Sequence, residues 1–455
     1  MPHWVTALRR GNWKSLFACF LYFDTGFTVW VMFGPLAPFI ARQLALSPSE
    51  SALLVAVPVL AAAIVRITFG NLFQCSDGRS LALLGIALSA VPPLALLLPL
   101  APTYTVLLVL GVFLGVGGAS FAVALPMAGS AYPRDVQGLV LGLAAAGNIG
   151  AVLDGFLFPS LAQMFGWQRA TAVSLPLLVF AAAAVLLWAE DRSAKSGRTA
   201  PAVGGLVVSF AGLIILVLAV ATGAPGRTGL LLLPVCGAAL AVAVLPQRYR
   251  ALLAERDTWV VMLVYSITFG GFVGMSSYVS LLLTLQYEMS KVEAGLVMAL
   301  LAFTGAMVRP LGGRLADRLS GVKVLLVLLL AIALINLAFA KGMPSLSASI
   351  TLLAALYLCF GLGNGATFQL VPQRWMGRTG IMTGLIGAAG GIGGFYLPVV
   401  MGLARETTGS YQLGFGVFAA LAALALGLVA ALHKRWLAWA APSTVEISLD
   451  EPITE

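Results

Sequence analysis

The stretch SPSESALLVAVPVLAAAIVR (residues 47–66) has a second copy, SKVEAGLVMALLAFTGAMVR (residues 290–309), 243 residues further along the chain. Seven of the twenty positions are identical, including the arginine that ends each copy, Arg66 and Arg309. Both copies begin with Ser-x-x-Glu, a pattern in which the serine caps a helix and the glutamate bonds back to the cap. The two copies therefore predict two helices with structural capping boxes and the same buried charge.

The same offset of 243 residues relates other parts of the chain. Tyr22 falls on Tyr265, and AAGNIG (145–150) falls on AAGGIG (388–393), where only Asn148 and Gly391 differ. One offset that serves several helices indicates two homologous halves. Both halves are expected to start on the same side of a membrane, so the repeat is parallel, as in the two halves of major facilitator transporters.

The composition is that of an integral membrane protein. Of the 455 residues, 60% are hydrophobic and only 9% are charged, whereas a soluble domain has about 25% charged residues. Apolar runs of about 20 residues recur along the chain, and each is expected to be a spanning helix. We predict an all-α polytopic protein with fourteen spans, at 16–40, 52–74, 80–100, 104–129, 136–163, 170–189, 203–222, 229–246, 258–286, 294–315, 322–340, 347–372, 380–403 and 411–432.

The positive charges indicate the orientation. With the N-terminus in the cytoplasm, 18 of the 26 Lys and Arg residues fall on the cytoplasmic side, six fall outside and two, Arg66 and Arg309, lie inside the membrane. This bias predicts that both termini are cytoplasmic. The membrane that we expect for this chain is the inner membrane of a bacterium. Because the basic residues sit in short loops, the net charge of +9 does not indicate a nucleic-acid partner. The first apolar run is too long for a signal peptide and is expected to be uncleaved.

Several kinds of chemistry are not expected. The four cysteines are far apart, without metal-ligand spacing or a disulfide framework. The two histidines, His3 and His433, lie near the chain ends. No nucleophile arrangement or cofactor loop is found in the sequence, so we expect no enzyme activity, no metal and no cofactor.

The two arginines within spans need an explanation. An arginine at the centre of a spanning helix costs at least ~2.5–3.5 kcal/mol. Each arginine could pair with an acid or a loop carbonyl near the cytoplasmic end. Alternatively, both face a cavity between the halves and bind a small oxyanion, which a planar guanidinium fork suits. Asn148 replaces a glycine of the other half, which indicates either a ligand contact or an inter-helix hydrogen bond.

At these residues the sequence resembles the nitrate/nitrite porter family of the major facilitator superfamily. The matching segments cover both halves: VWVMFGPLAPFIA (29–41), RITFG from Arg66, GGASF (117–121), AAGNIG with FGW (165–167), YSITFGGFVG (265–274), Arg309, GLGNGATFQLVP (361–372) and GAAGGIGGFYLP (387–398). The resemblance implies a major facilitator fold with two six-helix halves, 14–190 and 257–435. Between them, a linker (191–256) adds a hairpin of two spans (203–246) that the family normally lacks. Residues 436–455 are expected to be a disordered, acidic cytoplasmic tail.

The resemblance also implies which residues bind substrate. Arg66 and Arg309 hold the anion, Asn148 and Tyr265 donate hydrogen bonds, and Phe121 and Phe269 enclose the planar ion. Gly147 and Gly390 belong to the two signature segments and are expected at the same site. A core-packing role for either phenylalanine is the alternative. The expected partners are nitrate and nitrite, protons and the lipid bilayer, with the protein as a monomer.

The expected function is nitrate and/or nitrite transport by alternating access, with nitrate uptake by proton symport. Two acids lie well inside spans, Asp24 and Asp154, and these are the candidates for proton coupling. The context of Asp24, YFDTGFTVWV (22–31), resembles the proton-symporting branch of the family. A structural role for either acid stays open. The alternatives are a nitrate/nitrite antiporter and a drug/proton antiporter with fourteen helices, against which the two core arginines argue.

Overall fold

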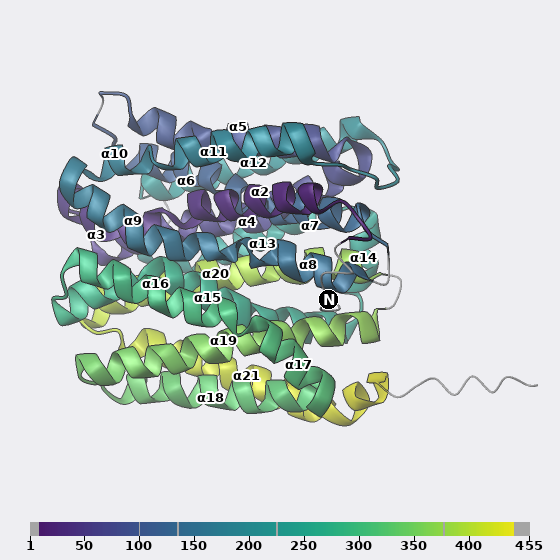
Figure 1. Cartoon of the computed structure of the whole chain (residues 1–455). Helices are drawn as coiled ribbons and strands as arrows, with labels where there is room; N and C mark the ends of the chain where they lie inside the picture. The colour runs from purple at the N-terminus through teal and green to yellow at the C-terminus, as the bar shows by residue number, and fades with distance from the viewer. Residues whose placement is uncertain (1–8, 100, 134–135, 224–225, 376–377, 441–455) are drawn as a thin grey trace, which may run out of the picture.

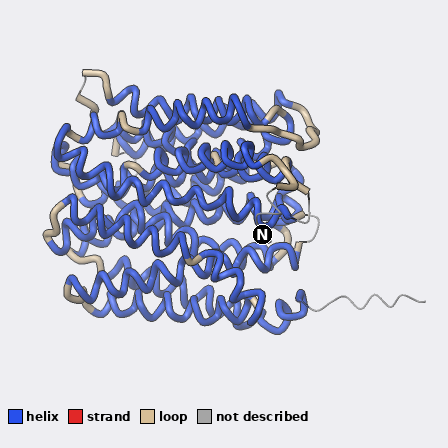
Figure 2. The backbone as a smooth tube through the Cα atoms, viewed as in Figure 1, coloured by secondary structure: helices blue, strands red, loops and turns tan. Residues whose placement is uncertain are grey.

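The computed structural model describes residues 9–99, 101–133, 136–223, 226–375 and 378–440. The described residues form helices and connecting loops without any strand (Figure 2). The long helices lie side by side and nearly parallel, as a single bundle (Figure 1). Among the described residues, thirteen helical stretches are long and apolar enough to cross a membrane. The structure is therefore that of a polytopic helical membrane protein, as the composition predicts.

Six spans lie in the first part of the chain, and several are built from two helices in succession. They are α2 (Trp13–Val31) with α3 (Phe33–Leu44), α4 (Pro48–Cys75), α5 (Gly78–Leu96), α6 (Tyr104–Ala119) with α7 (Phe121–Ser130), α8 (Gln137–Ala145) with η2 (Ala146–Ile149) and α9 (Gly150–Phe165), and α10 (Trp167–Thr171) with α11 (Ser174–Trp188).

Six further spans lie in the second part. They are α15 (Arg256–Tyr287), α16 (Lys291–Met307) with α17 (Arg309–Leu319), α18 (Gly321–Lys341), α19 (Leu346–Arg374), α20 (Thr379–Thr408) and α21 (Gln412–Leu437), which is followed by the short η3 (Ala438–Ala440).

The expected hairpin at 203–246 corresponds to α12 (Thr199–Ala221) and α13 (Gly226–Ala243). α12 is one of the thirteen candidate spans, and the 18-residue α13 occupies the place of the fourteenth. α12 packs on α4 and α6, while α13 packs on α20 and α4. A short helix, α14 (Gln247–Leu253), leads into the second six spans. The expected tail at 436–455 includes residues 441–455, which lie outside the described residues.

The two copies of the repeat begin as the sequence predicts. Ser47 and Ser290 each cap a helix, and in both places the glutamate three residues later closes a capping box. The copies then differ. α4 runs unbroken through Arg66, whereas α16 ends at Met307 and α17 starts at Arg309. Pro310 stands in the first turn of α17, where a proline is well tolerated because its missing N–H would have no partner in the helix.

The described chain starts and finishes at one end of the bundle, on the right in Figure 1, which we call the termini end. Asn12 donates to Glu190 at this end. In the second six spans Asp257 is 1% exposed at its side chain and accepts hydrogen bonds from Arg374, Arg435 and Trp436. The opposite end, which carries Ser47 and Ser290, is called the distal end.

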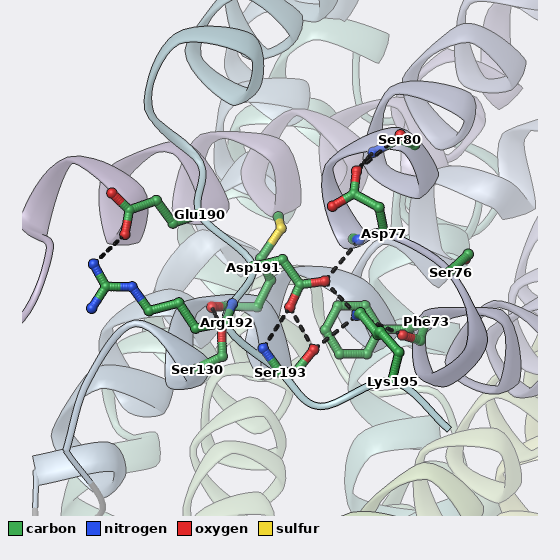
Figure 3. A network of polar contacts seen from close by, with 12 residues as sticks. Phe73, Ser76, Asp77, Ser80, Ser130, Glu190, Asp191, Arg192, Ser193 and Lys195 are labelled. Carbon is green, nitrogen blue, oxygen red and sulfur yellow. Dashed lines mark hydrogen bonds and ion pairs between the residues drawn. The ribbon is translucent and has the colours of Figure 1, made fainter. Parts of the chain in front are cut away.

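The linker after α11 is attached to the loop between α4 and α5 (Figure 3). Asp191 forms an ion pair with Lys195 and accepts a 2.8 Å bond from the Gly78 N–H at the start of α5. Burial would raise the pKa of the Asp191 carboxyl, but the hydrogen bonds from Lys195, Ser193 and Gly78 outweigh burial and lower it. The linker is thereby fixed to the termini end of the first six spans.

At the distal end, the first and second six spans touch through small residues. A Cβ on Gly155 of α9 would lie 2.5 Å from the Gly295 carbonyl oxygen of α16. A Cβ on Gly402 of α20 would lie 2.7 Å from the Pro48 oxygen, and one on Gly34 of α3 would lie 3.0 Å from the Ser277 Cα. These approaches, Gly155–Gly295, Gly402–Pro48 and Gly34–Ser277, are called the distal contact. Only residues without a side chain allow backbones to come this close.

Candidate anion site

Arg66 lies in the middle of the bundle and is 4% exposed. Its Nη1 donates to the Gly387 carbonyl of α20 at 3.2 Å, and its Nη2 donates to the Gly118 carbonyl of α6 at 2.9 Å. The sequence left open that the arginine pairs with an acid or a loop carbonyl. The structure instead gives it two carbonyls from helices, one from each set of six spans, and these bonds fix the direction of the guanidinium.

Aromatic rings surround the Arg66 guanidinium. Its central carbon lies 5.0 Å from the Phe121 ring centre, 5.7 Å from Trp30 and 5.8 Å from Phe269. A cation over an aromatic face is attracted by the negative charge of the ring face. The two phenylalanines that were candidates for enclosing an anion therefore lie on the arginine.

Arg309 is the first residue of α17 and reaches the same aromatic group. Its guanidinium carbon lies 5.6 Å from the Phe269 ring centre and 4.7 Å from Phe272. Among the described residues, its Nε and Nη2 are buried without a hydrogen-bond partner. Both arginines thus adjoin Phe269, and Arg309 holds buried donors that nothing described in the protein satisfies.

Tyr265 completes this group from α15. Its ring stacks on Phe269 at 5.1 Å with an angle of 13° between the planes, and both arginines act on its hydroxyl electrostatically. Gly390 of α20 allows this packing, because a Cβ there would lie 2.7 Å from Tyr265 and 2.8 Å from Phe269. The structure therefore brings Arg66, Arg309, Tyr265, Phe121, Phe269 and Gly390 together.

Asn148 and Gly147 lie in η2, between α8 and α9. Asn148 is 4% exposed, and its amide nitrogen donates to the Ala145 carbonyl at 2.9 Å. In the described part of the chain this amide nitrogen therefore bonds within its own turn. Gly147 packs on α2, since a Cβ there would lie 2.8 Å from the Phe23 ring. Among the described residues, neither Asn148 nor Gly147 makes a hydrogen bond to Arg66 or Arg309.

The two candidate acids lie on α2 and α9. Asp154 is 0% exposed, and both its carboxylate oxygens lack a hydrogen-bond partner among the described residues. Asp24 is half-buried, and the Gly150 N–H bonds to its carboxyl. The Gly150 N–H also bonds within the chain, to the Gly147 and Asn148 carbonyls of η2, so Asp24 adds to a contact that η2 already makes. The two acids interact with each other electrostatically.

Sequence reasoning missed four residues that contact the arginines: Trp30, Phe272, Gly118 and Gly387. Trp30 stands in VWVMFGPLAPFIA, Gly118 in GGASF and Gly387 in GAAGGIGG, so the quoted segments contain them. The glycines contact the arginines through backbone carbonyls, and Trp30 and Phe272 contact them through ring faces. Residue type does not reveal such contacts. No group of three or more His, Cys, Asp or Glu able to hold a metal is found in the described ranges.

A family model for the Major Facilitator Superfamily matches residues 18–398. The chain belongs to the Major Facilitator Superfamily. It is 31% identical over 431 residues to the "Probable nitrate/nitrite transporter NarK2" of Mycobacterium tuberculosis, covering 94% of this chain and 98% of that protein. It is also 29% identical to the "Nitrite extrusion protein" of Bacillus subtilis, with 91% of each chain covered. Within the superfamily, the chain is a member of the nitrate/nitrite porter family.

Solved structures support the fold. A POT family transporter matches with a TM-score of 0.68 and 12% identity, over 92% of this chain and 96% of that chain. The xylose transporter XylE from E. coli matches with a TM-score of 0.61 and 13% identity, over 93% and 98%. The predicted major facilitator fold is therefore confirmed, with two additional helices, α12 and α13, between two sets of six spans.

Proposed function

We propose that this protein carries nitrate and/or nitrite across the bacterial inner membrane by alternating access, and that it takes up nitrate together with protons. The observation that carries this proposal is the meeting of Arg66 and Arg309 at one aromatic ring. Proteins named nitrate/nitrite, nitrite or nitrate transporters are its relatives over at least 90% of the chain.

The charges favour an anionic substrate. Two guanidinium groups lie beside Phe269, and no acid among the described residues pairs with either of them. Buried charge without a partner is unfavourable, so an anion between the arginines offsets both. Arg309 offers its free Nε and Nη2, a planar pair of donors that matches two oxygens of a planar oxyanion.

Each site residue then has a role. Arg309 binds the anion with free donors, while Arg66 is aimed by the carbonyls of Gly118 and Gly387. Tyr265 and Asn148 donate further hydrogen bonds, and Asn148 exchanges its bond to Ala145 for one to the anion. Phe121 and Phe269 form flat walls that favour a planar ion over tetrahedral sulfate or phosphate. Gly147 and Gly390 let their helices approach the site.

Uptake needs a driving force. Moving one negative charge into a cell with a negative interior costs ~2.3 kcal/mol per 100 mV. One proton cancels this charge, and a second makes the potential favour entry. Asp24 and Asp154 are the proton carriers in this proposal. Exchange of nitrate for nitrite is electrically neutral and is the competing mechanism.

The orientation belongs to the same proposal. The bias of Lys and Arg puts the termini end in the cytoplasm, so the distal end faces outward. The protein acts as a monomer with functional halves at 14–190 and 257–435, joined by the linker 191–256 with its peripheral hairpin.

The test is nitrate uptake into proteoliposomes that contain the purified protein. An inward proton gradient is compared with trapped internal nitrite as the driving force. We expect uptake with the proton gradient and its loss in Asp24→Asn. Uptake that needs internal nitrite and ignores pH would establish exchange instead.

Arg66→Lys is the matched control, because lysine keeps the charge and loses the fork. No nitrate transport in either format, or full activity of Arg66→Lys, would refute the two-arginine site. Proton-driven efflux of a lipophilic cation, without nitrate transport, would favour the drug/proton antiporter.

A further inference from the structure

The seam between α2 and α9 collects polar atoms without partners. A Cβ on Gly150 would lie 2.5 Å from the Asp24 carbonyl oxygen and 2.6 Å from the Thr28 hydroxyl, so α9 rests on α2 here. Thr28 lies one turn beyond Asp24, and Asp154 lies one turn beyond Gly150. Residues four apart share a helix face. Asp24, Thr28 and Asp154, which we call the acid seam, therefore line one interface.

The acid seam holds several buried polar atoms without partners. Thr28 is 2% exposed and Asp154 is 0% exposed. In the described residues, the Thr28 hydroxyl, both Asp154 oxygens and Asp24 Oδ1 are buried without a hydrogen-bond partner. Buried polar groups are normally paired, and a carboxyl that gains a proton becomes a donor to a neighbouring oxygen, so a proton would give these atoms a hydrogen bond.

The charged groups around the seam do not neutralise it. α9 packs on α2, α3, α10, α16 and η2. The charged side chains on these helices are Lys14, Asp24, Arg42, Arg169, Lys291 and Glu293. Arg42, Arg169, Lys291 and Glu293 stand near the distal end, and Asp154 lies about 16 Å of helix before the end of α9. Lys14 lies in the first turn of α2, on the other side of Asp24, and Cys19 and Tyr22 of α2 are ordinarily neutral. Of the charged groups, it is the Asp24 carboxyl that acts on Asp154.

Asp154 is sealed by the distal contact. The next residue, Gly155, meets the Gly295 carbonyl, and a Cβ on Gly155 would lie 2.7 Å from Ala299. The packing of α9 on α16 thus leaves the Asp154 carboxyl 0% exposed, beside small residues that carry no charge. An ionised carboxylate without a partner is strongly disfavoured in such a place, whereas a protonated one is tolerated. Two interacting carboxyls also favour holding a shared proton.

We propose that Asp24, Thr28 and Asp154 form one proton-binding site, and that its protonated form allows the distal contact to close. This deepens, and rests on, the proton symport proposed above. When the distal contact opens, water reaches the seam and a proton binds Asp154. After closure the proton passes from the Asp154 carboxyl to the Asp24 carboxylate, with Thr28 as a hydrogen-bond bridge, and leaves toward the termini end. No oxidation or reduction is involved.

The second half lacks this device. The offset of 243 residues puts Ile267, Gly271 and Leu397 at the positions of Asp24, Thr28 and Asp154. The contact of α20 with α4, which corresponds to that of α16 with α9, therefore carries no acid at these positions. In this proposal, proton binding controls the contact of α16 with α9 and does not control the contact of α20 with α4.

The test measures the distal end directly, with the full chain in nanodiscs and without nitrate. Spin labels go on Arg42→Cys and Thr408→Cys, both exposed near the distal end, after the four native cysteines are replaced by serine. Distances are measured by double electron–electron resonance from pH 8.5 to pH 5.5. We expect the short-distance population to grow severalfold as the pH falls. Constant distances across this range would overturn the proposal.

Variants identify the groups that respond. Two variants remove the Asp154 carboxyl: Asp154→Asn, and Asp154→Leu, which introduces the residue type of Leu397 in the second half. In both, the distal contact is expected to stay closed at every pH. Asp24→Asn is expected to move the midpoint by at least one pH unit, whereas Asp317→Asn, an exposed acid on α17, leaves it unchanged. An unchanged response in both Asp154 variants would overturn the assignment. So would closure driven at constant pH by sodium in place of choline.

The outcome is separable from the proposed function. A protein that closes with falling pH but carries no nitrate refutes the substrate and leaves the proton site in place. A protein that takes up nitrate with protons while its distal end ignores pH refutes the acid seam and leaves the substrate in place.

Discussion

Arg66 and Arg309 occupy the same position in two copies of one sequence, yet their surroundings differ. Arg66 continues an unbroken helix and gives both terminal nitrogens to carbonyls. Arg309 follows a helix break and keeps two buried nitrogens free among the described residues. One residue later, Pro310 takes the place of Ile67. Among the described residues Arg66 keeps only its Nε without a partner, whereas Arg309 keeps Nε and Nη2, so the same position of the repeat holds one arginine that is largely bonded and one that is less so.

The rest of the repeat follows the same logic. Gly295 of α16 packs on Pro159 of α9, and Gly402 of α20 packs on Ala52 of α4. The offset exchanges these pairs, so one helix contact is built twice with the small and the large residue interchanged. At these packing contacts the two halves therefore use equivalent positions. They differ at Asn148, Asp24 and Asp154, the residues to which the proposed function gives polar roles.

The largest expected effect separates the two arginines. Arg309→Lys removes free donors, so we expect nitrate uptake to fall at least about 100-fold, since each bond to a charged group contributes about 1.5–3 kcal/mol. Its thermal stability should not fall. Arg66→Lys should lose uptake and also about 2 kcal/mol of stability, because one helix carbonyl loses its donor. Uptake and thermal unfolding are measured on the same purified samples.

Equal stability losses in the two lysine variants would contradict this distinction. Lys323→Arg on α18, away from the aromatic group, is the control for exchanging lysine and arginine and is expected to change neither property.

The second effect concerns Asn148 and Gly391, where the repeat differs. Asn148→Gly makes the first half like the second and removes one donor, so KM for nitrate should rise about tenfold. Asn148→Asp keeps the shape and should abolish uptake, because a negative charge repels the anion. Gly391→Asn should instead lower stability by about 1–3 kcal/mol through overpacking, since a Cβ there lies 2.6 Å from Ala63. An unchanged KM in Asn148→Gly would leave Asn148 as a structural residue of η2.

The sequence alone predicts the scaffold well. The capping boxes at Ser47 and Ser290 follow from two residues each, and both are confirmed. The span count follows from apolar run length: the described ranges hold thirteen candidate spans, and α13 is one further helix of 18 residues. These features depend on local sequence, in which the side chain and its effect lie within one helix turn.

Contacts between distant helices are harder to predict. The carbonyls of Gly118 and Gly387 accept from Arg66, but a backbone oxygen has no signature in residue type. The neighbourhood of Asp24 and Asp154 depends on how α2 and α9 align, although the two acids are 130 positions apart in the sequence. Residue type shows that these acids lie within spans. It does not reveal that they share a seam with Thr28 or that the distal contact seals it.

The third effect compares two aromatic walls. Phe269 adjoins both guanidinium groups, whereas among the described residues Phe121 adjoins the Arg66 guanidinium alone. Cation–π contacts contribute about 0.5–2 kcal/mol each, so Phe269→Leu should raise KM about tenfold and Phe121→Leu about threefold. Competition by sulfate should also strengthen in Phe269→Leu, because the flat wall is lost. The reverse order of the two KM values would make Phe121 the main wall and return Phe269 to core packing.

The smallest effect lies at the termini end, where the two halves are anchored by different acids. Asp191 is held by Lys195 and Gly78, and its pKa is lowered by these hydrogen bonds. A carboxyl with a lowered folded-state pKa stabilises the fold above its unfolded pKa of about 4 and loses that contribution as the pH falls. Asp191→Asn should therefore cost about 1–2 kcal/mol at pH 7, and this difference should shrink below about pH 4. Asp257→Asn should cost more, because Arg374, Arg435 and Trp436 all donate to that carboxylate. Thermal unfolding across this pH range distinguishes the two anchors, and a pH-independent cost of Asp191→Asn would show that its hydrogen bonds act without the charge.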